Sequence, residues 1–290
     1  MINNQKLSVL VLGASGMLGS TLFRLLSQSD MLDTFGTVRS TGALGQLPVA
    51  LHKDIVHGLD VSDVDNLHRV FAHIRPDVVI NCVGLVKQLM EVDDPLVVIP
   101  INALLPHRIA KLCDVAGARL IHVSTDCVFS GAKGGYCEND YPDASDLYGR
   151  SKYLGEVDYP HAITLRTSII GHELNSAHGL VNWFLRQQEQ VKGYTNAIFS
   201  GLPTVELARV IRDLIIPNTG LKGVYHVSAE PISKFDLLQL VAKVYGKNIT
   251  VNPDDVLKID RSLNSDRFRI ATGYAPPSWP DLIQQMSEFR

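Results

Sequence analysis

The sequence predicts an α/β protein in which a doubly wound parallel sheet is followed by a smaller C-terminal α/β lobe. Apolar runs that suit strands buried on both faces alternate with amphipathic segments through the first half of the chain. The first of these runs ends in a glycine-rich turn that leads into a helical pattern. After about Gly171 the alternation becomes irregular, which indicates a change of architecture.

Five apolar runs are expected to be strands of the sheet, namely 7–13, 34–39, 76–84, 118–126 and 162–171. Between the second and third of these runs, segment 62–74 carries one apolar helical face. Ser62 is the expected N-cap of that helix, with Asp65 three residues further on.

The second half of the chain predicts helices over 175–190, 204–216 and 233–245, the last capped by Ser233, and a short strand over 223–229. No linker rich in Gly, Pro or Ser separates the two halves, so they are expected to share one core. The predicted division is 1–170 and 171–290, with about 200–228 packing back on the first part.

Composition narrows the range of functions. The 290 residues are 46% hydrophobic and 20% charged, with a formal net charge of −3 and no basic block. Binding to nucleic acid or to a membrane surface therefore has no electrostatic support. The four cysteines form no C-x-x-C pair, so neither a metal site nor a disulfide framework is expected. We found no signal peptide and no apolar stretch long enough to cross a bilayer, and we expect a cytoplasmic protein with free thiols.

The glycine-rich turn predicts a phosphate-binding loop. It reads "VLGASGMLGS" and follows the first strand directly. Glycines allow a tight turn and a close approach of the backbone to a pyrophosphate, which the helix N-terminus then attracts. An ordinary turn is the alternative, but the position after the first strand favours a dinucleotide site. Its residues are Gly13, Ser15, Gly16, Met17, Leu18 and Gly19.

The residue at the end of the second strand selects the cofactor. A carboxylate there binds the adenosine ribose of NAD, whereas an arginine suits the 2′-phosphate of NADP. The sequence offers Arg39 and no carboxylate beside it. Asp60 and Val61, at the end of the next strand, are placed to meet the adenine. Arg39 could equally be a solvated surface residue, and Asp60 a turn residue.

A tyrosine and a lysine four residues apart indicate acid chemistry. Tyr148 and Lys152 would share one face of a helix. Ser124 and Thr125 lie at the end of the fourth apolar run, at the sheet edge where ligands bind in such folds. Their hydroxyls could hold a substrate carbonyl, or could only bond a local turn.

Several motifs occur together in the order found in one large enzyme group. They are the glycine pattern, "NCVG" at Asn81–Gly84, "STDCVF", and Tyr148-x-x-x-Lys152. In these motifs the chain resembles the extended short-chain dehydrogenases/reductases. The phrases "VSTDCVFSG", "LRTSIIG" and "RSLNSDRF" are similar to those of dTDP-4-dehydrorhamnose reductases and related nucleotide-sugar 4-ketoreductases. The resemblance covers nearly the whole chain.

The resemblance implies a Rossmann-like NADP-binding domain over 1–170 and a substrate-binding lobe over 171–290. The implied reaction is reduction by NADPH of the 4-keto group of a dTDP- or UDP-linked 4-keto-6-deoxyhexose. Tyr148 would supply the proton, and Lys152 would lower its pKa from about 10 and bond the nicotinamide ribose. Thr125 would hold the ketone oxygen. A homodimer is also implied.

Further contacts follow from the same resemblance. Around the cofactor they are Asn81, Cys82, Val83, Gly84 and Asn102, although Asn102 could also be a surface amide. The candidates around the substrate are Lys87, Gln88, Asp126, Arg166, His172 and Arg261, each of which is also an ordinary surface residue type.

Two other readings stay open. Cys127 matches a cysteine used as an acid/base in an epimerase–reductase, which also needs a histidine; His172 lies close to that position but is displaced by one residue. The same thiol could instead be simply buried. A non-catalytic NADP-binding regulatory subunit is the other reading, although such proteins often lose the tyrosine or the lysine. Dehydratase activity is not expected, because Cys127 stands where those relatives have a glutamate.

Overall fold

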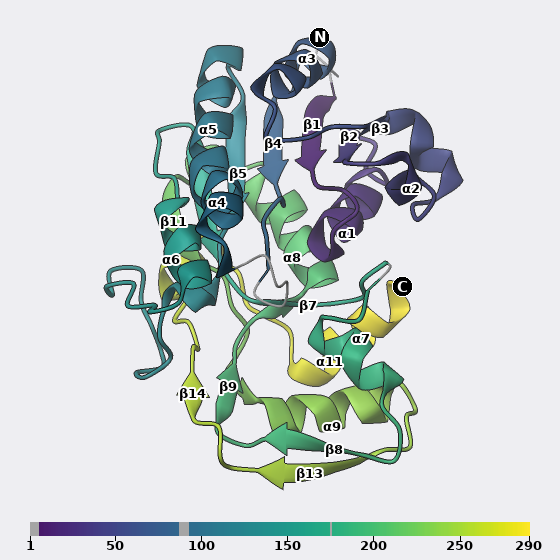
Figure 1. Cartoon of the computed structure of the whole chain (residues 1–290), viewed down its shortest axis with the longest axis vertical. Coiled ribbons are helices and arrows are strands. Elements are labelled where there is room, and N and C mark those ends of the chain that lie inside the picture. Colours follow the sequence, from purple (N-terminus) through teal and green to yellow (C-terminus); the bar gives the residue numbers. More distant parts are fainter. Residues whose placement is uncertain (1–5, 87–92, 175) are drawn as a thin grey trace.

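A computed structural model of the chain describes residues 6–86, 93–174 and 176–290. In this part of the chain, seven strands form one parallel sheet in the order β11-β6-β5-β4-β1-β2-β3. The predicted α/β fold with a doubly wound parallel sheet is therefore confirmed (Figure 1). The strands are β1 (Leu7–Leu12), β2 (Leu32–Val38), β3 (Ile55–His57), β4 (Val78–Asn81), β5 (Arg119–Val123), β6 (Ala162–Arg166) and β11 (Gly223–His226).

The sheet is covered on both faces, as the continuous apolar runs require. Val9 and Val11 of β1 pack in one buried cluster with helices α1 and α8. Leu10 and Leu12, which point to the opposite face, pack in a second cluster with α3 and α5. These helices are α1 (Met17–Leu26), α3 (Val64–Ile74), α5 (Leu105–Ala116) and α8 (Thr204–Val210).

The N-terminus of α3 differs from the prediction by one residue. Asp63, not Ser62, is the N-cap, and its carboxylate accepts hydrogen bonds from the backbone N–H groups of Asp65 and Asn66. Both residue types are good N-caps, so sequence alone could not choose between these neighbours.

Contrary to the expectation from sequence, the run Pro95–Ala116 is long and apolar enough to cross a membrane, with a mean hydropathy of 1.4. It comprises α4 (Pro95–Val98), a π-helical segment (Ile99–Leu104) and α5. Leu105, Ile109 and Cys113 are buried against the sheet. This packing is that of a core helix.

The C-terminal lobe consists of small sheets and helices that lie below the large sheet in Figure 1. Its strand pairs are β7 (Ile169–Ile170) with β10 (Leu202–Pro203), and β8 (Gln190–Tyr194) with β13 (Thr250–Asp254). A third sheet joins β9 (Ala197–Phe199), β12 (Ile232–Ser233) and β14 (Ile259–Asp260). The helices are α7 (Leu180–Arg186), α9 (Lys234–Val244), α10 (Asp266–Thr272) and α11 (Trp279–Glu288).

One segment of the second half returns to the first. β11 pairs with β6 at the edge of the large sheet, and α8 packs against α1. Both lie within 200–228. Two short α-helices of the described residues, α2 (Thr41–Leu44) and α6 (Leu147–Leu154), lie in the first half of the chain.

Candidate active site

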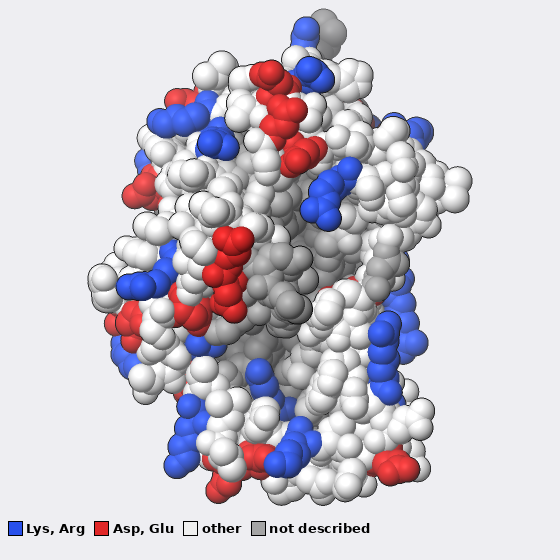
Figure 2. Space-filling model, in the orientation of Figure 1, with Lys and Arg blue, Asp and Glu red and all other residues white. Residues whose placement is uncertain are grey.

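A cavity of about 780 Å³ opens at the carboxyl ends of β1, β4, β5 and β6. It is lined by the four loops that follow these strands and by residues of the C-terminal lobe. The strand order reverses between β1 and β4, which is where ligands bind in doubly wound sheets. Figure 2 shows the hollow, with basic side chains within its lower part.

The glycine-rich turn after β1 has the geometry of a phosphate site. Gly13 adopts a φ of +84°, and a Cβ on Gly19 would overlap the carbonyl oxygen of Gly13. Gly16 is the N-cap of α1, and no side chain caps the helix. Ser15–Leu18 line the cavity, so the N–H groups of the first helical turn face a ligand. The turn therefore fits a dinucleotide pyrophosphate.

The predicted adenosine contacts lie beyond the cavity lining. Arg39 directly follows β2, is exposed, and forms no ion pair with a described residue. The carboxylate of Asp60 accepts a hydrogen bond from Ser62 N at 2.9 Å, which is a turn contact. Val61 packs against the cluster under α3. Gln46, which was not predicted, does line the cavity.

Two buried asparagines shape the loop after β4. Asn81 accepts a hydrogen bond from Val83 N at 3.0 Å. Asn102, in the π-helical segment, accepts from Leu85 N at 2.8 Å and donates to Leu85 O at 3.1 Å. The loop residues Cys82, Val83 and Gly84 line the cavity, whereas the two asparagines only hold them there. Lys87 and Gln88 lie outside the described residues.

Helix α6 brings Tyr148 and Lys152 to the cavity. Asp146 is its N-cap and accepts a hydrogen bond from Gly149 N at 2.8 Å. Lys152 is only 6% exposed, and its Nζ donates to Val123 O at 2.9 Å. Burial lowers the pKa of Lys152 to about 8, and the negative charge of Glu156 opposes that shift.

The pKa of Tyr148 is shifted upwards, whereas the sequence analysis predicted a downward shift. Burial raises it, as would negative charge on Cys127 or Asp126, while a hydrogen bond with the Thr125 side chain opposes the rise. Lys152, expected to lower this pKa, instead gives its hydrogen bond to the backbone of β5. The phenol is therefore kept protonated, which is the form that a proton donor needs.

Three predicted residues gather beside Thr125. The Asp126 carboxyl is buried, and burial raises its pKa. Burial and then Asp126 raise the pKa of the Cys127 thiol to about 12. Arg261 reaches this group from the C-terminal lobe, where its Nε donates to Phe129 O at 2.8 Å and its Nη1 to Cys127 Sγ at 3.8 Å.

Two predicted substrate residues do not line the cavity. Arg166 is buried and forms an ion pair with Glu156, with an Nη2–Oε2 distance of 2.7 Å. It is the last residue of β6 and is absent from the cavity lining, whereas Thr167 and Ser168 after it are part of that lining. His172 Nε2 lies 2.9 Å from the hydroxyl of Tyr245 on α9. Neither residue is therefore in a position to contact a substrate in this cavity.

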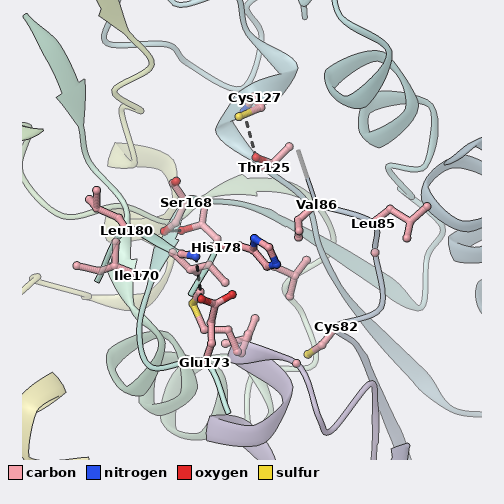
Figure 3. A pocket seen from close by; sticks show the side chains of 18 of the residues that line it. Cys82, Leu85, Val86, Thr125, Cys127, Ser168, Ile170, Glu173, His178 and Leu180 are labelled. Carbon is pink, nitrogen blue, oxygen red and sulfur yellow. Dashed lines mark hydrogen bonds between the residues drawn. The ribbon is translucent and has the colours of Figure 1, made fainter. Parts of the chain in front are cut away.

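Other lining residues were missed by the sequence analysis. Thr167 and Ser168 are the first two residues after β6, so the rule that ligands bind at carboxyl ends of strands could have found them. Figure 3 shows His178 projecting into the cavity between Ser168 and Val86. Lys234, the first residue of α9, also lines the cavity. Among the described residues no His, Cys, Asp and Glu cluster could hold a metal ion.

Comparisons with known proteins agree with this geometry. The family model of the RmlD substrate binding domain matches residues 7–269. A probable low-salt glycan biosynthesis reductase, Agl14, from Haloferax volcanii is 27% identical over 85% of this chain and 83% of its own length. Methionine adenosyltransferase 2 subunit beta from Danio rerio is 29% identical over 82% of this chain and 73% of its own.

A solved structure extends the similarity to the fold. The dTDP-4-dehydrorhamnose reductase from Bacillus anthracis, in complex with NADP, superposes with a TM-score of 0.80. The match covers 98% of each chain at 23% identity. At that identity the similarity establishes the fold, including the C-terminal lobe.

Proposed function

Because the chain belongs to the family of the RmlD substrate binding domain, we propose that it reduces the 4-keto group of a nucleotide-linked 4-keto-6-deoxyhexose. It is an oxidoreductase of the extended short-chain dehydrogenase/reductase type, and its cofactor is NADP(H). The proposed substrates are dTDP- or UDP-linked, and the proposed role is deoxysugar or surface polysaccharide biosynthesis.

The convergence of Thr125, Tyr148 and Lys152 on one cavity carries the proposal. Bound NADPH would supply a hydride to the ketone carbon. Thr125 would then hold the ketone oxygen, and the protonated Tyr148 would donate the proton that the developing oxyanion needs. Lys152, with a pKa near neutrality, would contribute positive charge close to that proton transfer.

The two ends of the cavity suit two phosphorylated ligands. The first turn of α1 would hold the pyrophosphate of the cofactor, and Arg39 would meet its 2′-phosphate. Lys234 and Arg261 line the part formed by the C-terminal lobe, and neither forms an ion pair with a described residue. We assign these two cations to the diphosphate of the sugar nucleotide.

The two alternative functions, epimerase–reductase and regulatory subunit, have less support. An epimerase–reductase would use Cys127, but its raised pKa disfavours the thiolate, and His172 is engaged by Tyr245. A regulatory subunit remains the second candidate, because one relative is named as a subunit of methionine adenosyltransferase. Tyr148 and Lys152 both face the cavity here, which favours an enzyme. A cytoplasmic location and a homodimer are also proposed.

A panel of dTDP-, UDP- and GDP-linked 4-keto-6-deoxy sugars tests the proposal, with NADPH oxidation followed by its absorbance. We expect consumption of NADPH with at least one dTDP- or UDP-linked sugar. Binding of NADPH without consumption on any sugar would support the regulatory reading. The Tyr148→Phe variant, measured in parallel, shows whether the observed oxidation uses the proposed site.

A further inference from the structure

A buried ion pair lies directly behind the catalytic helix. The side chains of Arg166 and Glu156 are only 4% and 5% exposed. Nε and Nη2 of Arg166 donate to Oε1 and Oε2 of Glu156 at 2.8 and 2.7 Å. Burying two charges is costly unless both are well hydrogen-bonded, so this bidentate geometry calls for a role.

Glu156 connects this pair to the catalytic residues. It follows α6, which carries Lys152 four residues earlier. Its Oε1 also accepts a hydrogen bond from the Ser124 hydroxyl at 2.8 Å. Ser124 lies between Val123, whose carbonyl oxygen binds Lys152, and the proposed substrate contact Thr125. One carboxylate thus joins the end of α6 to the end of β5.

Arg166 extends the connection to β11 at the edge of the large sheet and, through His226, to the C-terminal lobe. Its Nη1 lies 3.3 Å from Nε2 of His226 on β11. Nδ1 of His226 faces the carbonyl oxygens of Tyr136 and Asn264 at 3.0 and 3.2 Å, so Nδ1 carries the hydrogen and Nε2 accepts from Arg166. Burial and Arg166 lower the pKa of His226 to about 3, so this histidine is neutral.

We infer that Glu156 is a positioning residue that holds Lys152 in its charged form, and that Arg166 limits the strength of that effect. The inference rests on the proposed function, since it gives Lys152 the role assigned there. Glu156 acts on two cations, Lys152 through its charge and Arg166 through direct hydrogen bonds. Arg166 therefore serves the site from behind it and does not bind substrate.

The groups that face Lys152 determine in which direction its pKa should shift in each variant. They are Glu156 beyond α6, Cys82 after β4, His122 on β5 and Tyr148 on the same helix. Burial lowers the pKa of Lys152 to about 8, and Glu156 raises it. Loss of the Glu156 charge must lower this pKa further, and the unpaired Arg166 left behind acts in the same direction. Loss of the Arg166 charge must raise it.

The test compares Glu156→Gln with Arg166→Gln. Turnover and NADPH affinity are both measured from pH 6 to 10, and the midpoint of the decline at high pH is read for each. We expect this midpoint to move down by roughly one pH unit in Glu156→Gln, as for the loss of a neighbouring opposite charge, and to move up in Arg166→Gln. A loss of packing alone would not move the midpoints of the two variants in opposite directions.

Glu206→Gln is the matched control. Glu206 is also a buried carboxylate, and it accepts a hydrogen bond from the hydroxyl of Tyr274 at 3.1 Å, but it does not line the cavity. This variant should leave the midpoint unchanged, whatever its effect on the melting temperature. Midpoints that stay fixed, or move in the same direction, in the two test variants would overturn the inference.

The two readouts separate this inference from the proposed function. If no sugar nucleotide is reduced by the wild-type protein, the proposed function fails, but NADPH affinity still reports the charge of Lys152. Circular dichroism shows whether each test variant is folded. If only one variant folds, the direction in which its midpoint should move is still predicted. A midpoint that moves in the opposite direction, or does not move, refutes the inference.

Discussion

The guanidinium of Arg261 lies 3.8 Å from the sulfur of Cys127, with Nη1 as the donor. A cation in this position favours a thiolate, yet the pKa of Cys127 is raised to about 12. Burial has the larger effect, and the neighbouring Asp126 adds to it. Arg261 and Cys127 therefore form a contact that shapes the cavity and does not create a base.

Cys127→Ser should keep reductase turnover within about threefold of wild type, because a protonated thiol offers no acid/base catalysis that a hydroxyl would lose. With wild-type enzyme, NADPH and substrate in D₂O, the positions flanking the ketone should gain no carbon-bound deuterium beyond an enzyme-free control. Mass spectrometry of the product measures this. Enzyme-dependent deuterium that Cys127→Ser abolishes would favour the epimerase–reductase.

Tyr148→Phe should lower turnover by roughly 10²–10⁴-fold while NADPH still binds, because general acid catalysis has this magnitude. Steady-state rates and fluorescence titration with NADPH measure the two effects. Tyr153→Phe is the matched control, since Tyr153 lies on the same helix but is 40% exposed and does not line the cavity. Full activity in Tyr148→Phe would remove this residue as the proton donor.

Arg39→Ala should reduce the preference for NADPH over NADH by roughly 10- to 100-fold, the range expected for one hydrogen bond to a charged group. The ratio of kcat/KM for the two cofactors measures it. Arg69→Ala, a change at another exposed arginine, should leave the ratio unchanged. An equal effect in both variants would mean that overall charge, and not contact with the 2′-phosphate, sets the preference.

Gly19→Ala should destabilise the protein by about 1–3 kcal/mol and weaken NADPH binding, because the new Cβ would overlap the carbonyl oxygen of Gly13. Urea denaturation and a binding titration measure these effects. In Gly42→Ala the nearest atom to the new Cβ is Ser40 Oγ at 3.9 Å, so this control should be tolerated. Unaltered NADPH binding in Gly19→Ala would separate the turn from the cofactor.

Lys234→Met should raise the KM for the sugar nucleotide by roughly tenfold or more and leave the KM for NADPH unchanged, because a charged phosphate contact is lost. Initial rates with each substrate varied in turn measure both constants. Lys243→Met, on the same helix but away from the cavity lining, is the control. A rise confined to the KM for NADPH would move Lys234 to the cofactor.

Local patterns predicted the large sheet well, because a strand buried on both faces must be apolar throughout. Val9 and Leu10 illustrate this, since each packs in a different core cluster. The residues after β1, β4 and β5 were also predictable, because carboxyl ends of parallel strands meet at one edge.

The rest of the site depends on contacts that sequence does not encode locally. Arg166 and Glu156 are ten residues apart, and only the fold shows that they pair. His172 and His178 lie on one irregular segment, where no periodicity tells which side chain points inward; the structure places His178 in the cavity and His172 against Tyr245. Lys234 begins a helix of the C-terminal lobe, whose orientation follows from tertiary packing.

The pairing of β11 with β6 has a consequence for how the protein is made and dissected. A chain cut at residue 170 would lack β11 and leave β6 as an open edge, ready to pair with other chains. It would also lack α8 and so expose the apolar side of α1, the helix that follows the glycine-rich turn. We therefore do not expect residues 1–170 to fold stably when expressed alone, and during synthesis the large sheet can be completed only after residue 226 has left the ribosome.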